Sequence, residues 1–433
     1  MKKTRWFAVV YGLILTVVTL AGIEALASFY VPAWPARALR TIPPVNMDTT
    51  MKALTDKPWM GKPFNSWGMN DREHSLAKPA DVSFRSVFVG DSFVEFALNP
   101  QTLPAAVEER ATEHGVKGFE AVNLGISATN PRSYYYRMRD VALALSPDAL
   151  LVFFFSGNDF MGADAGYGSL IPPLVDESPG GSILGSIMPR TNWLLVNRLR
   201  LSEFLRGNKP IPGEFDTLYA IAHGPAADRI PATVEHVKKY YYPDLSEQKL
   251  TEILSRGGDR FWAAFEKRPH DEEYLMGWLL NLIVASEVRQ DNQATIRTPE
   301  DAEKYKADGE ISATLSWLQA MQNLAAEHHV PLRVFLIPNA SVAPDFVDFW
   351  KPWPRYYSWY ILTDVWHQKL AQALAHTDVP FVDLRQDFMG VSGTYRMIDA
   401  HWTEKGVGIA ADHVYSELTA MMAKQKQRSS GAH

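Results

Sequence analysis

The chain of 433 residues contains no cysteine. Disulfide bonds, thiol catalysis and metal sites built on thiolates are therefore excluded. A large charge excess is also absent, because 43 basic and 49 acidic side chains leave a formal net charge of −6. This balance gives no reason to expect a nucleic-acid partner. The sequence shows no internal repeat and no residue spacing typical of a metal site, so we expect neither a metal nor a cofactor.

One long apolar run lies at the N-terminus, over residues 6–23, with Lys2, Lys3 and Arg5 before it and Glu24 after it. Its 18 residues would span roughly 27 Å as a helix, close to the hydrocarbon core of a bilayer. The basic flank predicts that Met1 stays in the cytoplasm and that the rest is exported. A cleaved signal peptide is the alternative, because Ala25-Leu26-Ala27 fits a small-residue cleavage site. We favour an anchor in the cell membrane with a single span and the folded domain on the periplasmic or extracellular side.

Short apolar runs that alternate with helical patterns predict a parallel sheet with helices on both sides. The expected strands cover residues 87–89, 119–124, 149–155, 332–337 and 380–384. Asn99-Pro100 and Asn130-Pro131 are expected to begin the first two helices, and Gly115 is expected to end the first. A last helix is expected from about Glu404, with Thr403 as its cap.

The alternation breaks at residues 161–310, where Pro/Gly-rich stretches precede charged helical segments. We interpret this region as an inserted, mainly helical cap. The predicted organisation is an anchor or signal segment at 1–30, a linker with covering loops at 31–80, a core domain at 81–160 and 311–424, and a disordered tail at 425–433. Residues 65–71 are expected to form a turn, or alternatively a lip of the active site.

Aromatic residues are concentrated between residues 346 and 360. Such a run can provide a platform on which sugars stack. We favour instead packing in the core, or a surface that rests at the membrane interface, where Trp and Tyr are common.

Polar motifs follow the first three expected strands. Ser92 follows the first, Asn123-Leu124-Gly125-Ile126-Ser127-Ala128 the second, and Ser156-Gly157-Asn158-Asp159 the third. In an open parallel sheet, ligands bind at the carboxyl ends of the strands. The three motifs should therefore converge on one crevice.

Ser92 and His401 are the expected catalytic pair. A serine on the tight turn Gly90-Asp91-Ser92 would present its hydroxyl at the rim of the sheet, where a distant base can take its proton. His401 would be that base, and Asp399 would hold the imidazole in the tautomer that accepts the proton. Each motif alone could be an ordinary turn or a helix cap. Together, in this order and at strand ends, they favour a serine hydrolase.

With these motifs the chain resembles the SGNH (GDSL-type) hydrolase family over residues 84–160 and 310–424. The resemblance implies a flavodoxin-like three-layer α/β/α sandwich with a five-stranded parallel sheet. It implies that Ser92 is the nucleophile, that His401 is the general base and then acid, and that Asp399 orients the imidazole. It also implies an oxyanion hole made of the Ser92 N–H, a backbone N–H of the second motif and the Asn158 amide.

Two positions depart from the family pattern. The family has a glycine about three residues after Gly125, where this chain has Ala128, so the donor of the second motif is Ala128 or, alternatively, Gly125. Ala128 keeps its N–H but would be strained in a left-handed conformation. The family usually has glycine two residues before Asn158, where this chain has Ser156. Neither change removes a group that the mechanism needs.

We therefore expect an exported, membrane-anchored serine esterase that works through an acyl-serine intermediate. Its substrate would be an ester, in the first place an O-acetyl group of a cell-surface glycan or of a small molecule. Action on acetylated polysaccharide is implied by the resemblance to anchored family members. A polysaccharide O-acetyltransferase with the same triad is one alternative, and a non-catalytic envelope scaffold or glycan-binding domain is another. The expected partners are the substrate and, through the N-terminal helix, the membrane.

Overall fold

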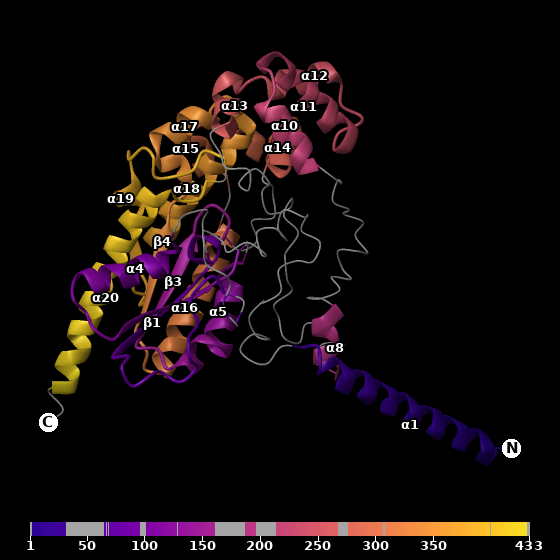
Figure 1. Cartoon of the computed structure of the whole chain (residues 1–433), viewed down its shortest axis with the longest axis vertical. Coiled ribbons are helices and arrows are strands. Elements are labelled where there is room, and N and C mark those ends of the chain that lie inside the picture. The colour runs from indigo at the N-terminus through magenta and orange to yellow at the C-terminus, as the bar shows by residue number, and fades with distance from the viewer. Residues whose placement is uncertain are drawn as a thin grey trace.

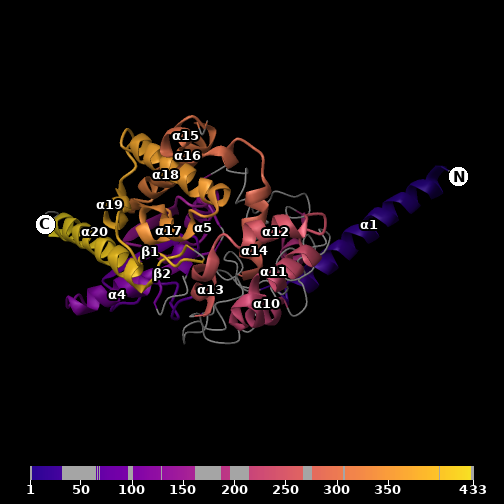
Figure 2. The ribbon, with the colours of Figure 1, turned by 90° about the horizontal axis from the view of Figure 1, so that it is seen from above.

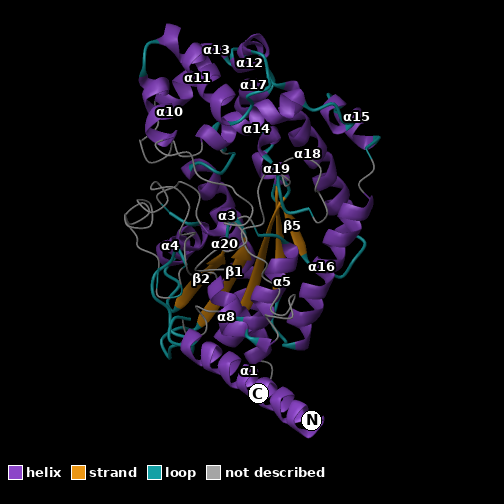
Figure 3. Ribbon diagram, turned by 90° about the vertical axis from the view of Figure 1, so that its right-hand side faces the viewer, coloured by secondary structure: helices purple, strands orange, loops and turns teal. Residues whose placement is uncertain are grey.

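A computed structural model describes residues 2–31, 65, 67, 69–95, 101–127, 129–160, 187–195, 214–266, 276–305, 308–398 and 400–430. Its centre is one sheet of five parallel strands in the order β2-β1-β3-β4-β5. The strands are β1 (Phe84–Gly90), β2 (Phe119–Gly125), β3 (Ala149–Phe155), β4 (Leu332–Ile337) and β5 (Phe381–Asp383). This order is that of flavodoxin-like doubly wound folds. The predicted five-stranded parallel sheet is confirmed, and Figure 3 shows β2 and β5 at its opposite edges.

The strand ends differ from the prediction at β1 and β5. β1 begins three residues before the predicted Val87, and it includes the polar Arg85 and Ser86. Arg85 has no exposed surface, and its Nε donates to Glu120 Oε2 at 2.5 Å. Glu120 is the residue of β2 that pairs with Arg85 in the sheet. This buried ion pair lets a charged residue lie inside the sheet, which hydrophobicity alone does not predict. β5 is shorter than predicted, with three partly buried residues at the edge of the sheet.

Helices cover both faces of the sheet, and every residue of β1, β2 and β3 is therefore buried. Val107 and Val414 belong to the core on one face, and Met138 and Met321 belong to the core on the other. The helices of the first face are α4 (Leu103–Glu113) and α20 (Glu404–Ser430); those of the second are α5 (Pro131–Asp140), α16 (Asp308–Glu327) and α18 (Pro354–Leu374). Figure 1 shows these three layers side by side. The three-layer α/β/α sandwich is confirmed.

Short helical elements connect these layers and make up most of the described part of the insertion. They are α3 (Ser92–Glu95), η1 (Ala142–Leu145), α8 (Pro189–Trp193), α10 (Glu214–His223), α11 (Ala226–Tyr240), α12 (Glu247–Leu254), α13 (Gly258–Glu266), α14 (Met276–Val288), η4 (Gln293–Thr295), α15 (Pro299–Glu303), η5 (Ala340–Val342), α17 (Pro344–Trp350) and α19 (Arg385–Phe388).

The helix ends show where local sequence signals acted. α5 begins as predicted, with the Asn130 side chain accepting the Ser133 N–H, and Gly115 follows the end of α4 with a φ of +71°. α4 begins at Leu103, where the Thr102 hydroxyl accepts the Ala105 N–H, and not at the predicted Asn99-Pro100, which lies outside the described residues. Thr102 as the cap, with Pro104 at the second helical position, is as good a helix start signal as Asn99-Pro100. The predicted start was the earlier of these two signals.

The last helix begins as predicted at Glu404, and the Val407 N–H bonds the Thr403 carbonyl. α20 then continues to Ser430, through a segment for which the sequence suggested a disordered tail. The Gln425 side chain donates to Asp148 Oδ1 at 3.0 Å, which ties this polar stretch to the body of the protein.

Helices α10–α14 form a bundle, the cap bundle, that lies beyond the α17 and α18 end of the sheet domain (Figures 1 and 2). The Trp353 indole N–H donates to the Ile253 carbonyl at 2.8 Å, and the Glu287 carboxylate accepts the backbone N–H groups of Arg355 and Tyr356. Glu287 thus caps the N-terminus of α18 from the neighbouring α14. The apolar core of the cap bundle continues into that of the sheet domain.

The aromatic run between 346 and 360 is packed inside the protein. Its Phe and Trp side chains are at most 8% exposed, and Trp350 has no exposed surface. Trp350 and Trp353 lie between the cap bundle and α18, with ring contacts to Phe261. The preference for core packing over a sugar-stacking platform is confirmed.

α1 (Lys2–Ala27) extends away from the rest of the molecule (Figures 1 and 2). Its segment Val10–Ala27 is long and apolar enough to cross a membrane, with a mean hydropathy of 2.0. A membrane anchor and a signal sequence both fit such a helix. The Glu24 carboxylate, near its end, accepts the backbone N–H groups of Arg190 and Thr191 in α8.

Candidate active site

The turn that carries Ser92 follows β1 directly. The backbone carbonyl of Asp91 accepts the N–H groups of Val94 and Glu95, and its side chain accepts the Phe93 N–H, so the chain turns at once into α3. Gly90 is required here, because a Cβ at this position would lie 2.6 Å from a methyl carbon of Val94. Ser92 is 7% exposed and lies just after the carboxyl end of β1.

His401 reaches Ser92 from a position 309 residues later in the chain. Its Nε2 lies 2.7 Å from Ser92 Oγ, within hydrogen-bond distance. The neighbouring residues support this placement: the Phe93 ring contacts the His401 ring at a centroid distance of 5.0 Å, and it meets Trp402 edge-on at 4.9 Å. The structure therefore brings together the two residues that the sequence proposed as nucleophile and base.

The turn before His401 is strained. Ala400 has a φ of +58°, in the left-handed region that side chains disfavour, and its N–H bonds the Arg396 carbonyl. The Arg396 N–H in turn donates to the His401 carbonyl at 2.8 Å, which closes the turn around the histidine. Asp399 lies outside the described residues, so its role as the orienting carboxylate stays a prediction.

In the second motif, Asn123 connects β2 with the serine turn. Its side-chain oxygen accepts the Gly125 N–H at 2.8 Å, and its amide donates to the Val94 carbonyl at 2.9 Å. The Gly125 N–H is therefore already engaged within the motif. Ala128, the other proposed donor, lies outside the described residues. Gly125 lets β2 lie close to the backbone of α3, since a Cβ at this position would lie 2.2 Å from the Glu95 nitrogen.

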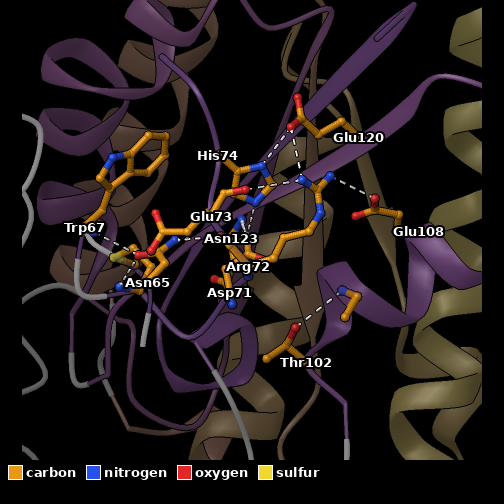
Figure 4. A network of polar contacts seen from close by, with 12 residues as sticks. Asn65, Trp67, Asp71, Arg72, Glu73, His74, Thr102, Glu108, Glu120 and Asn123 are labelled. Carbon is orange, nitrogen blue, oxygen red and sulfur yellow. Dashed lines mark hydrogen bonds and ion pairs between the residues drawn. The ribbon is translucent and has the colours of Figure 1, made fainter. Parts of the chain in front are cut away.

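The described residues of the predicted turn at 65–71, which are residues 65, 67 and 69–71, bring the chain back on itself against β2. The Asn65 N–H bonds the Met69 carbonyl, and Asp71 Oδ2 accepts the Asn123 N–H at 2.8 Å. The segment therefore lies beside the edge strand β2 and holds the second motif through the contact between Asp71 and Asn123, which Figure 4 shows.

A buried charge network continues from this turn (Figure 4). The two ring nitrogens of His74 lie 2.8 Å from Asp71 Oδ2 and 2.8 Å from Glu120 Oε1. Burial alone would lower the pKa of His74, but the hydrogen bonds to Asp71 and Glu120 raise it. Burial would likewise raise the pKa of Glu120, but hydrogen bonds from His74 and Arg85 lower it to about 2. Because carboxylates only accept, His74 is best satisfied as an imidazolium that donates from both nitrogens.

The third motif places Asn158 beside the serine turn. The Asn158 side chain lies close to the carboxylate of Asp91, the residue before Ser92, and lowers the pKa of that carboxylate, although burial raises it overall. Within the described part of the chain, its Oδ1 is buried and accepts no hydrogen bond. The next residue, Asp159, accepts the Phe155 N–H and the Tyr134 hydroxyl, both at 2.7 Å. These contacts fix the turn under the site.

Two buried carboxyl groups, Asp91 and Asp159, thus lie in the turns that carry Ser92 and Asn158. Burial raises the pKa of Asp91 to about 6, against the opposing effects of the Phe93 N–H and the charge of His401. Burial and the charge of Asp91 raise the pKa of Asp159 well above its usual range. Arg137, also buried, donates to the Gly90 and Leu124 carbonyls at 2.9 Å and so joins the ends of β1 and β2.

The described residues contain no group of three or more His, Asp or Glu that could hold a metal ion. The chemistry that this arrangement permits is proton transfer between a hydroxyl and an imidazole, with amide donors close by. His74 and Arg137 were not identified from the sequence, because no local motif marks them; Asp91 and Asp159 lie in the quoted motifs, but their burial was not predicted.

Comparisons with known proteins add little to this geometry. No protein-family model matches the chain, and no curated protein does. Among solved structures, a Bacteroides fragilis protein described as an acylhydrolase has 11% identity and a TM-score of 0.33, with coverage of 81% of this chain and 92% of its own. A GDSL-like lipase of Bacteroides thetaiotaomicron has 11% identity and a TM-score of 0.32, with coverage of 80% and 92%. The activity therefore has to be inferred from this chain's own residues.

Proposed function

We propose that this protein is a serine esterase that forms an acyl intermediate on Ser92. The main support is the 2.7 Å contact between Ser92 Oγ and His401 Nε2, made at the carboxyl end of β1 by residues far apart in the sequence. Parallel sheets bind ligands at this end. A serine held against an imidazole in this way is an activated nucleophile.

In the proposed reaction, Ser92 Oγ attacks the ester carbonyl carbon while His401 Nε2 takes the hydroxyl proton. The tetrahedral intermediate collapses, and His401 returns the proton to the departing alcohol oxygen. Water then attacks the acyl-serine, again with His401 as base; His401 returns the proton to Ser92 Oγ as the bond to the acyl carbon breaks, and the acid is released. Asp399 is proposed to hold the other ring nitrogen and so to stabilise the imidazolium.

The negative charge on the carbonyl oxygen requires donors that are already in place. We assign these to the Ser92 N–H, the Ala128 N–H and the Asn158 amide. An amide has two N–H donors, so Asn158 can bond Asp91 with one and the oxyanion with the other. Gly125 is the less favourable donor in the second motif, because its N–H already bonds Asn123.

The proposed substrate class is an acyl ester, in the first place an O-acetyl group on a cell-surface glycan. The support is the apolar helix α1, which fits an anchor that would hold the enzyme at the membrane. Transfer of the acyl group to a sugar hydroxyl would use the same groups, with the hydroxyl in place of water. Protease accessibility of the C-terminus tests the proposed outward orientation, in cells whose cell membrane is intact but whose outer envelope is permeable to the protease, and in lysed cells. Cleavage only after lysis would contradict it.

The test of the activity uses the full-length chain, purified in detergent, with an aryl acetate as substrate. Ser92→Ala should reduce kcat by at least about 10³-fold. Ser312→Ala, which removes an exposed serine hydroxyl on α16, should leave kcat unchanged. Equal rates for the wild type and Ser92→Ala would reject the proposal. Adding a glycan acceptor and measuring acetate against acetylated glycan separates hydrolysis from transfer.

A further inference from the structure

A second Ser–His–Asp arrangement includes Ser156, the first residue of the third motif. Ser156 Oγ is 2.6 Å from His367 Nδ1, and His367 Nε2 is 2.7 Å from Asp383 Oδ1. Ser156 follows β3, His367 belongs to α18, and Asp383 ends β5. Three elements of the core are thus joined by one chain of hydrogen bonds.

This arrangement is not a second nucleophilic site. Ser156 is 1% exposed and the His367 side chain is fully buried, so no ester can reach the hydroxyl. Burial would raise the pKa of Asp383, but the hydrogen bond from His367 lowers it, so this carboxylate is charged and only accepts. The His367 N–H therefore lies on Nε2, and Nδ1 accepts a hydrogen bond from the Ser156 hydroxyl.

Helix α18 also holds Gly157, the residue after Ser156. Trp359, two helical turns before His367 on α18, donates its indole N–H to the Gly157 carbonyl at 2.8 Å. The Ser156 N–H bonds the Ile337 carbonyl of β4 at 3.0 Å. The two residues that precede Asn158 are therefore fixed by side chains of α18 and by the sheet.

We propose that Ser156, His367 and Asp383, together with Trp359, are positioning residues for the Asn158 amide. The inference rests on the proposed function, in which Asn158 stabilises the oxyanion. Such a donor acts only if it is held close to the place where charge develops. The family that the sequence resembles usually has a glycine at the position of Ser156, which offers no hydroxyl. In this chain the serine ties the turn to α18 and β5.

The test compares kcat and KM for an aryl acetate among variants of the full-length chain. Ser156→Ala should reduce kcat roughly 10-fold, less than the 10²- to 10³-fold typical of losing a donor itself, and should leave KM unchanged. Ser358→Ala is the matched control, because it removes another buried serine hydroxyl, bonded to the Arg355 carbonyl on α18. This control should keep wild-type kcat.

A double-mutant cycle with Asn158→Ala separates positioning from general stability. If Ser156 acts through Asn158, Ser156→Ala should cause no further loss of kcat in the Asn158→Ala background. If the two losses multiply, or if Ser156→Ala alone keeps wild-type kcat, the positioning role is wrong.

Should Ser156→Ala fail to fold, His367→Asn takes its place in the same cycle. This variant removes the imidazole that joins Ser156 to Asp383, so the same loss in kcat, absent in the Asn158→Ala background, is expected. The activity of Ser92→Ala distinguishes a failure of the proposed function from a failure of the positioning role. If Ser92→Ala is fully active, the proposed function fails; if Ser92→Ala is inactive but the cycle shows multiplied losses, only the positioning role fails.

Discussion

At the scale of single residues, the site depends on groups held in unfavourable environments. Asp91 is a buried carboxyl group, and Ala400 adopts a backbone conformation that suits glycine. Such features persist only where the surrounding structure enforces them, and they concentrate at functional sites. Here the two residues are direct neighbours in sequence of Ser92 and His401.

Replacing Asp91 with Asn should change how stability depends on pH. Burial raises the native pKa of Asp91 from 3.8 to about 6, so the folded state binds this proton more tightly than the unfolded chain. The contribution of Asp91 is present below about pH 4 and is lost as the pH rises through about 6. Asp91→Asn does not titrate, so its free energy of unfolding relative to the wild type should increase by on the order of 2 kcal/mol between pH 4 and pH 7.

Urea denaturation of both proteins across this pH range measures the difference. Asp159→Asn should show a change of the same sign, because burial raises the pKa of Asp159 as well. A constant difference between Asp91→Asn and the wild type would contradict the raised pKa.

The residues Ser92 and His401 were predictable because each lies in a short motif next to a strand or helix boundary. His74 and His367 were not predictable in this way. His74 meets Glu120 across 46 residues of sequence, and His367 meets Ser156 across 211. No pattern in one sequence records such contacts, since the packing of distant elements creates them.

At the scale of secondary-structure elements, the sheet was predictable from apolar runs of the right length between helix start and stop signals. Two element boundaries differ from the prediction: β1 extends over Arg85, which pairs with Glu120 inside the sheet, and α4 begins at Leu103, after the Thr102 cap. In both cases the deciding interaction is a polar contact, and hydrophobic periodicity does not report it.

The most consequential contact between elements is the Glu287 cap of α18. The Glu287 side chain is 2% exposed, bonds Arg256 at 2.6 Å, and accepts the Arg355 and Tyr356 N–H groups. Glu287→Ala should lower the free energy of unfolding by about 2–4 kcal/mol, because it leaves two N–H groups of the α18 terminus without an acceptor and removes one of the two carboxylates that Arg256 bonds.

Glu287→Gln keeps an oxygen acceptor for the α18 N–H groups and should lose clearly less. Thermal unfolding of the two variants and the wild type provides the comparison. A Glu287→Ala protein with wild-type Tm would show that the cap bundle does not stabilise α18.

At the scale of the whole molecule, α18 connects the cap bundle to the candidate active site. Its first turn is capped by Glu287 of α14, and its later turns hold Ser156 and Gly157 through His367 and Trp359. The sequence predicted a helical insertion but not this connection, because charged helical patterns do not specify which surface they pack against. The roles assigned to the insertion and to α1 stay proposals.

The central claim, that Ser92 is a nucleophile activated by His401, is tested most directly by covalent labelling. A fluorophosphonate probe is incubated with the full-length chain, and the adduct is located by mass spectrometry of the digested protein. The account predicts one adduct, on Ser92, with labelling strongly slowed in His401→Ala. An unlabelled Ser92 in the folded wild-type protein, or labelling of Ser92 at the same rate without the imidazole, would contradict it.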